Sequence, residues 1–77
     1  MDLDEAKKIY PPIWTIYDHP LDHPRWFVVR VWYGEVPGEM CLRVDLNMAR
    51  KAAWTMGASV ILARDEHDDA KIVESWI

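Results

Sequence analysis

The sequence predicts an α+β fold, in which a short N-terminal helix is followed by elements in the order β-β-α-β-β. One main helix is expected to pack on one face of a mixed or antiparallel sheet. Three observations predict this class: a capped amphipathic segment lies in the second half of the chain, β-forming runs flank it, and turn-forming residues separate those runs. The chain has 77 residues and is 51% hydrophobic, so residues 1–77 are predicted to form one domain around one core.

The first predicted element is a short helix over residues 2–9. Asp2 stands at the N-cap position, and Glu5 occupies the reciprocal position of a capping box. Pro11 and Pro12 end the helix, because proline cannot continue its hydrogen bonds. A helix this short is unstable alone in water, so we expect its apolar residues to dock on the rest of the domain.

Two strands follow the helix. Residues 13–17 and 26–33 are rich in β-branched and aromatic residues, and residues 18–24 connect them through a turn with two prolines. Residues 34–39 predict a loop with a Pro-Gly turn at its centre. Residues 40–44 predict a short further strand.

The main helix is predicted over residues 46–56. Asp45 is the expected N-cap, and Gly57 stands where a left-handed C-terminal residue belongs. Trp54 falls on the polar side of this helix. The opposite, apolar face carries Leu46, Ala49, Ala52, Ala53 and Met56. Residues 59–63 and 71–77 predict the last two strands, with an acidic turn between them.

Alternation along the strands predicts which side chains face the core. On the second strand the all-apolar set is assigned to the core: Phe27, Val29, Val31 and Tyr33. The other set is assigned to the outer face: Trp26, Val28, Arg30 and Trp32. On the last strand Glu74 and Trp76 are expected to join Arg30, which predicts an outer aromatic patch. Burial of that patch in the core or in a dimer interface is the competing interpretation, so the chain is expected to be a monomer or a homodimer.

The charge pattern restricts the possible partners. There are 13 acidic and 9 basic residues, giving a formal net charge of -4. A negative domain gains nothing from releasing counterions from nucleic acid, so direct binding to DNA or RNA is disfavoured and a basic protein surface is favoured. The acidic N-terminus and the lack of a long apolar run predict neither a signal peptide nor a membrane span. Cys41 is the single cysteine, which suits a reducing cytoplasm.

No pattern typical of an enzyme or a cofactor site is present. Cys41 lacks the local signature of a nucleophile, and Ser59 and Ser75 fall inside predicted strands. His19 and His23 have a spacing that suits metal binding on a helix, but Pro20 and Pro24 rule out a helix there. A metal-binding or regulatory module built on these two histidines and His67 is therefore one alternative hypothesis, and a homodimeric structural protein is another.

Two stretches carry a resemblance to known proteins. Residues 14–32 read WTIYDHPLDHPRWFVVRVW, and residues 68–77 read DDAKIVESWI. In both, the chain resembles a family of small uncharacterised proteins from bacteria and prophages, over less than half of its length. The resemblance implies a mobile-element context. Small acidic phage proteins of this build include anti-CRISPR inhibitors, some of which occupy DNA-binding surfaces of type I effector complexes.

These observations together predict a non-enzymatic phage or prophage inhibitor in the cytoplasm of a bacterial host. It is expected to bind a host protein complex by presenting carboxylates, as mimics of DNA phosphates, to a basic nucleic-acid-binding surface. Trp54 is the expected apolar anchor of this contact. The predicted partner-binding residues are Asp18, Asp22, Trp54, Asp65, Glu66, Asp68, Asp69 and Glu74.

Overall fold

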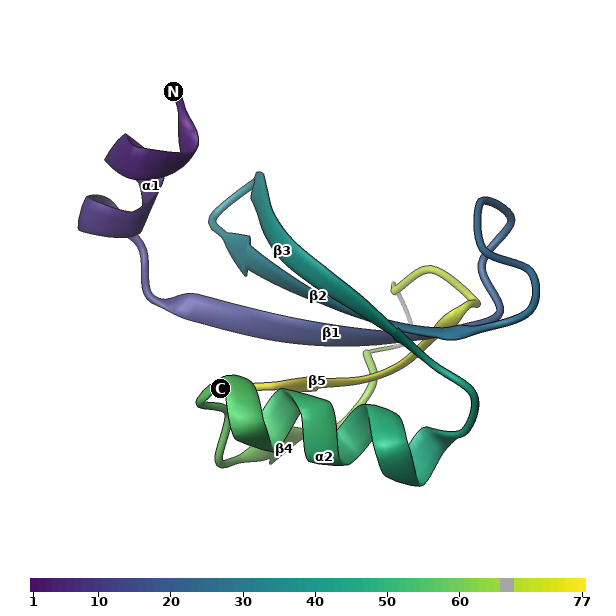
Figure 1. Cartoon of the computed structure of the whole chain (residues 1–77). Coiled ribbons are helices and arrows are strands. Elements are labelled where there is room, and N and C mark those ends of the chain that lie inside the picture. The colour runs from purple at the N-terminus through teal and green to yellow at the C-terminus, as the bar shows by residue number, and fades with distance from the viewer. Residues whose placement is uncertain (66–67) are drawn as a thin grey trace.

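A computed structural model describes residues 1–65 and 68–77 and confirms the α+β class. The elements are α1 (Leu3–Ile9), β1 (Pro12–Asp18), β2 (Phe27–Tyr33), β3 (Val36–Arg43), α2 (Leu46–Met56), β4 (Ile61–Leu62) and β5 (Ile72–Trp76) (Figure 1). The strands form one sheet in the order β3-β2-β1-β5-β4, and all four pairings are antiparallel. The sheet is thus antiparallel throughout, and its middle strand is β1.

Both helices begin where the sequence places them. The Asp2 carboxylate accepts a hydrogen bond from the Glu5 amide at 2.9 Å, and the Asp45 carboxylate accepts one from the Met48 amide at 2.8 Å. α2 ends at Gly57, whose φ of 119° is a left-handed conformation that favours glycine. Local capping therefore determines the bounds of α2, as predicted.

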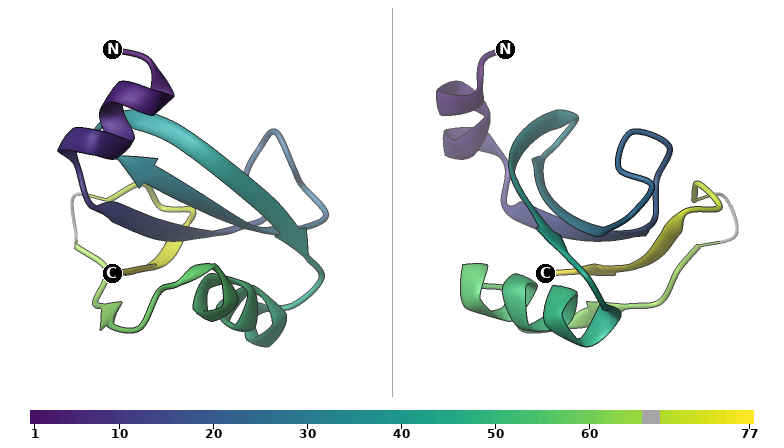
Figure 2. Two further views of the ribbon diagram at one scale, coloured as in Figure 1. Left: turned by 60° about the vertical axis from the view of Figure 1, so that its left-hand side comes forward. Right: turned by 45° about the vertical axis from the view of Figure 1, so that its right-hand side comes forward.

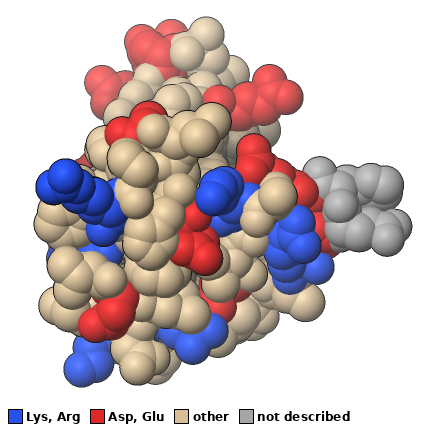
Figure 3. All heavy atoms as spheres, turned by 90° about the vertical axis from the view of Figure 1, so that its right-hand side faces the viewer, with Lys and Arg blue, Asp and Glu red and all other residues tan. Residues whose placement is uncertain are grey.

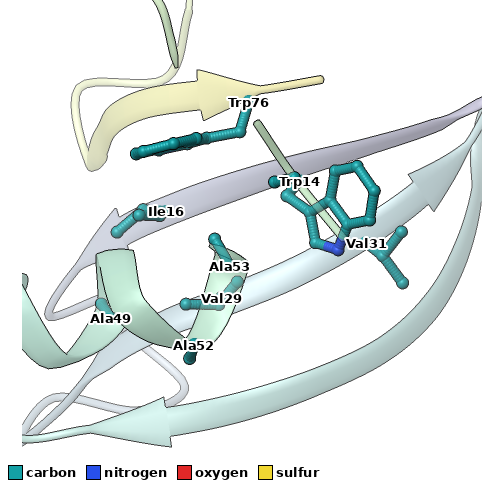
Figure 4. Packing of buried hydrophobic residues seen from close by; sticks show 9 residues of the cluster. Trp14, Ile16, Val29, Val31, Ala49, Ala52, Ala53 and Trp76 are labelled. Carbon is teal, nitrogen blue, oxygen red and sulfur yellow. The ribbon is translucent and has the colours of Figure 1, made fainter. Parts of the chain in front are cut away.

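The core lies between α2 and one face of the sheet (Figure 4). α2 contributes three small buried residues, Ala49, Ala52 and Ala53, which let its backbone approach the sheet closely. The sheet contributes larger buried side chains: Trp14, Ile16, Val29, Val31 and Trp76. Phe27 and Tyr33 pack against this cluster, so the predicted inward set of β2 is confirmed.

α1 docks at the end of the β2–β3 hairpin (Figure 1). Ala6 is fully buried there, and the Lys7 ammonium lies 5.8 Å from the centre of the Tyr33 ring. The ring of Tyr10 lies close to the backbone of Gly34. This packing supplies the stability that a seven-residue helix lacks by itself.

The predicted loop over residues 34–39 is wrong, because β3 already begins at Val36. The hairpin turns at Gly34 and Glu35, and the positive φ of 63° at Gly34 suits the first central position of a type II′ turn. Pro37 and Gly38 lie within β3, where the register with β2 shifts. The Pro-Gly pair therefore marks a β-bulge and not a turn. β4 also differs, since it covers only two of the five residues predicted for it.

The predicted outward direction of Glu74 and Trp76 is also wrong. Trp76 pairs with Trp14 and Glu74 pairs with Ile16, so both side chains lie on the α2 face. Trp76 is only 6% exposed and belongs to the core. The aromatic patch predicted around Arg30 therefore does not form. Alternation identifies two sets of side chains on a strand. The set that contains Glu74 faces inward here because Arg50 on α2 forms an ion pair with the Glu74 carboxylate.

Gly38 provides a test of the bulge. A Cβ atom at this position would lie 2.8 Å from Cγ1 of Val31 and 3.0 Å from Cε2 of Tyr33, both inside contact distance. We expect Gly38→Ala to lower the free energy of unfolding by about 1–3 kcal/mol in urea denaturation. Glu39→Ala, at the exposed neighbouring position, should change it by less than about 0.5 kcal/mol. Equal stability of the two variants would contradict the close packing at the bulge.

Candidate functional site

The two loops that carry most of the predicted acidic residues meet at one end of the sheet. The end of β1 lies beside the start of β5, where the Asp18 amide donates to the Lys71 carbonyl at 2.7 Å. A groove of about 460 Å³ lies between the loops. Its lining residues are Tyr17, Pro20, Leu21, Asp22, Asp69, Ala70 and Lys71. The tertiary structure thus joins two acidic segments that are about 50 residues apart in the sequence.

The first acidic loop, between β1 and β2, is closed by its own backbone. The His19 amide donates to the Trp26 carbonyl at 3.0 Å, and the His19 ring packs edge-on against Phe27. The Asp18 carboxylate pairs with Nδ1 of His19. Asp22 has a side chain that is 74% exposed, and it lies 3.8 Å from Nε2 of His23. Both carboxylates are therefore held near solvent, as a contact surface requires.

The second acidic loop, before β5, is held by its own carboxylates. Asp68 accepts a hydrogen bond from the Asp65 amide at 3.0 Å, and Asp69 accepts one from the Lys71 amide at 2.8 Å. These are the local bonds by which aspartate stabilises turns. Of the other predicted groups in this loop, Glu66 and His67 lie outside the described residues.

The charge at this end is mixed. The two loops contribute the described carboxylates of Asp18, Asp22, Asp65, Asp68 and Asp69, and the cations of Arg25, Arg64 and Lys71. Figure 3 shows acidic and basic side chains alternating over the face that includes this end, with an acidic group beside the grey segment. The net charge of this end is therefore negative, but cations lie among the carboxylates.

Glu74, which was also predicted to bind a partner, is buried and bonded to other residues of this chain. It is 6% exposed, and its two oxygens accept bonds from Nη2 and Nε of Arg50 at 2.7 and 3.0 Å. Nε1 of Trp76 donates to Oε2 at 2.7 Å. With all of these bonds made, Glu74 joins α2 to β5 and does not present a free charge.

The Glu74 network shifts the pKa values of its members. Burial alone would raise the pKa of the Glu74 carboxyl, and this is the largest single effect. The hydrogen bonds from Arg50 and Trp76 and the charge of Arg50 together outweigh it, so the pKa lies below its ordinary value of 4.5. The hydrogen bond to Glu74 raises the pKa of Arg50 in turn. The ion pair is thus charged throughout the neutral range.

Trp54 is exposed as predicted, but it is not beside the acidic loops. Its side chain is on the last turns of α2, and the residue is 65% exposed. It lines a shallow pocket of about 440 Å³ with Arg50, Lys51, Thr55 and Trp76. α2 runs away from the acidic end (Figure 1). The pocket at Trp54 and the groove between the acidic loops have no lining residue in common.

The face of the sheet away from α2 carries Arg30 in its middle. Strand register places Met40, Arg30, Thr15 and Ser75 in one row across β3, β2, β1 and β5. The β2–β3 hairpin and the loop between β1 and β2 rise on this side of the sheet (Figure 2, right). Arg30 is the one charged residue in the otherwise apolar sequence of β2, and this charge is the feature of the sequence that marks this face of the sheet.

Metal ligands and the single cysteine were the other groups considered from the sequence. Within residues 1–65 and 68–77, no three or more His, Cys, Asp or Glu side chains gather as metal ligands. Burial raises the pKa of the Cys41 thiol, with the charge of Arg43 opposing it in part. The reactive thiolate is therefore disfavoured at this position.

Comparison with protein-family models, with curated proteins and with solved structures found no match. Neither helix in the described residues has the length and apolar character needed to cross a membrane.

Removing Arg50 tests the buried pair. Arg50→Ala leaves the Glu74 carboxylate buried without its cation. We expect the free energy of unfolding to fall by about 1–3 kcal/mol, less than for a fully buried pair because the Arg50 side chain is 41% exposed. Lys51→Ala, which removes an exposed cation one residue away, is the matched control and should stay within about 0.5 kcal/mol of the unchanged chain.

Glu74 also predicts a pH dependence. Its pKa is lower in the folded chain than in the unfolded chain, so its contribution is complete above the unfolded value and is lost as the pH falls through the folded value. Glu74→Gln removes this titration. The difference in unfolding free energy between the unchanged chain and Glu74→Gln should therefore shrink over the range from neutral pH to below the ordinary carboxyl value of 4.5. A constant difference in urea denaturation across that range would contradict the pair.

Proposed function

We propose that this chain is a non-catalytic inhibitor of phage or prophage origin, of the anti-CRISPR kind, that binds a basic nucleic-acid-binding surface of a host defence complex. The observation that supports this best is the meeting of the two acidic loops beside β1 and β5. The phage context rests on the sequence resemblance, and the acidic contact rests on the geometry.

Preorganisation makes these loops suitable for binding. The Asp18–Lys71 backbone bond and the turn bonds of Asp68 and Asp69 restrain the described parts of the loops. This restraint reduces the conformational entropy lost when a partner binds. Carboxylates held in this way can compete for the Arg and Lys side chains that would otherwise contact phosphates.

The mixed charge pattern favours a folded protein partner. Arg25, Arg64 and Lys71 are interspersed with the carboxylates, so a uniformly positive surface would meet some repulsion. A protein surface with its own acidic groups between the basic ones would match the pattern and gain specificity. The proposed target surface is therefore mainly basic, with a few carboxylates at matching positions.

Neutralising the acidic end tests the proposal. In the variant Asp22→Asn/Asp68→Asn/Asp69→Asn the amide oxygens can still accept the turn hydrogen bonds, so only charge is removed. The control Asp4→Asn/Glu5→Gln/Glu35→Gln removes three charges near α1, at the other end of the molecule (Figure 1). Each tagged protein is used for affinity capture from a bacterial host with several defence systems, and retained proteins are identified by mass spectrometry.

We expect the unchanged chain and the control to retain the same nucleic-acid-binding complex. The acidic-end variant should retain at least about tenfold less of that complex. Added target nucleic acid should release the complex from the chain, because both ligands compete for one surface. Equal capture by the acidic-end variant, or capture unaffected by nucleic acid, would contradict the proposal.

A further inference from the structure

Arg30 lies in a small pocket on the face of the sheet that α2 leaves uncovered. The pocket measures about 270 Å³. Its lining residues are Tyr17, Pro20, Asp22, Val28, Arg30 and Trp32. β1 and β2 provide the floor, and the loop between them provides one wall. The residues therefore come from the paired strands β1 and β2 and from the loop that the His19–Trp26 backbone bond closes.

The guanidinium of Arg30 has few partners for its position. It donates to Sδ of Met40 at 2.9 Å, but a thioether sulfur is a weak acceptor. Among the described residues, no carboxylate lies within 4.0 Å of it, since the ion pairs found there are those of His19, His23 and Arg50. Arg30 is also half-buried. Most of its five N–H donors are thus available to an anion.

Flat apolar surface lies directly beside this cation. The Arg30 guanidinium carbon is 6.0 Å from the centre of the Trp32 ring, within the range of a cation–π contact. Buried Val28 and the ring of Tyr17, which pair across β1 and β2, form the opposite side of the pocket. A ligand with an anionic group at Arg30 would place its body between these side chains.

We propose that this pocket binds a small aromatic anion, a single flat ring that carries a carboxylate or a phosphate. Its volume is slightly below the roughly 300–1,000 Å³ of ordinary ligand sites, so it selects a small ligand. Asp22 stands at the rim with its carboxylate largely in water, so it opposes an anion there and leaves Arg30 as the place where the anionic group can bind. This pocket adjoins the groove of the proposed acidic contact, with which it shares Tyr17, Pro20 and Asp22, but the proposal does not depend on that contact.

The test separates the charge of the ligand from its ring. Full-length ¹⁵N-labelled chain is titrated with phenyl phosphate and benzoate, with inorganic phosphate and acetate as anions without a ring, and with phenol as a ring without either group. We expect saturable shifts for the two aromatic anions, centred on the signals of Arg30, Trp32 and Val28. The probes that lack one feature should bind at least about tenfold more weakly. Absence of saturable shifts with the aromatic anions, or equal binding of inorganic phosphate, would overturn the proposal.

Three variants locate the binding. Arg30→Met keeps an unbranched apolar stem but removes the guanidinium, and it should weaken binding of phenyl phosphate at least about tenfold, whereas Lys51→Met, on α2, should not change it. Asp22→Asn should strengthen binding, because it removes the negative charge at the rim. The amide spectrum of Arg30→Met shows whether it is folded. If Arg30→Met is not folded, two results would overturn the assignment together: an unchanged affinity of Asp22→Asn for phenyl phosphate, and ligand-induced signal shifts at residues away from the pocket.

Discussion

The double pairing of β1 is the constraint on which the rest of the structure depends. β1 bonds to β2 along its full length on one side and to β5 on the other. Its register places Trp14 and Ile16 under α2 and directs Thr15 and Tyr17 to the opposite face. The same pairing brings the loop after β1 next to the loop before β5. The core, the acidic end and the Arg30 pocket are thus three consequences of one strand's position.

The Arg50–Glu74–Trp76 network explains how a charged residue can lie in this core. A carboxylate leaving water loses favourable solvation, and three strong donors to its two oxygens offset that loss here. The network also joins α2 to the C-terminal strand, beyond the apolar contacts of its alanine face. In such a small core the network fixes the orientation of α2 on the sheet, because few other positions of α2 would let Arg50 bond to the Glu74 carboxylate.

The two proposed binding sites are neighbours that use different interactions. The acidic end offers exposed charge on preorganised loops, which suits a large, mainly basic partner. The Arg30 pocket offers one cation among apolar and aromatic side chains, which suits a small anion. Asp22 borders both, since it lines the groove between the loops and the rim of the pocket. Removing its charge is therefore expected to act in opposite directions at the two sites.

The sequence by itself determined the α+β class, the bounds of α2 and the inward set of β2, because capping residues and side-chain periodicity act within a few residues of one another. It misplaced the Pro-Gly pair, since Gly38 is required by contacts with Val31 across the hairpin and not by a turn. Only the tertiary structure decided that Glu74 faces Arg50 and that the two acidic loops meet. Both depend on pairing between β1 and β5, and contacts between segments so far apart leave no pattern in either segment alone.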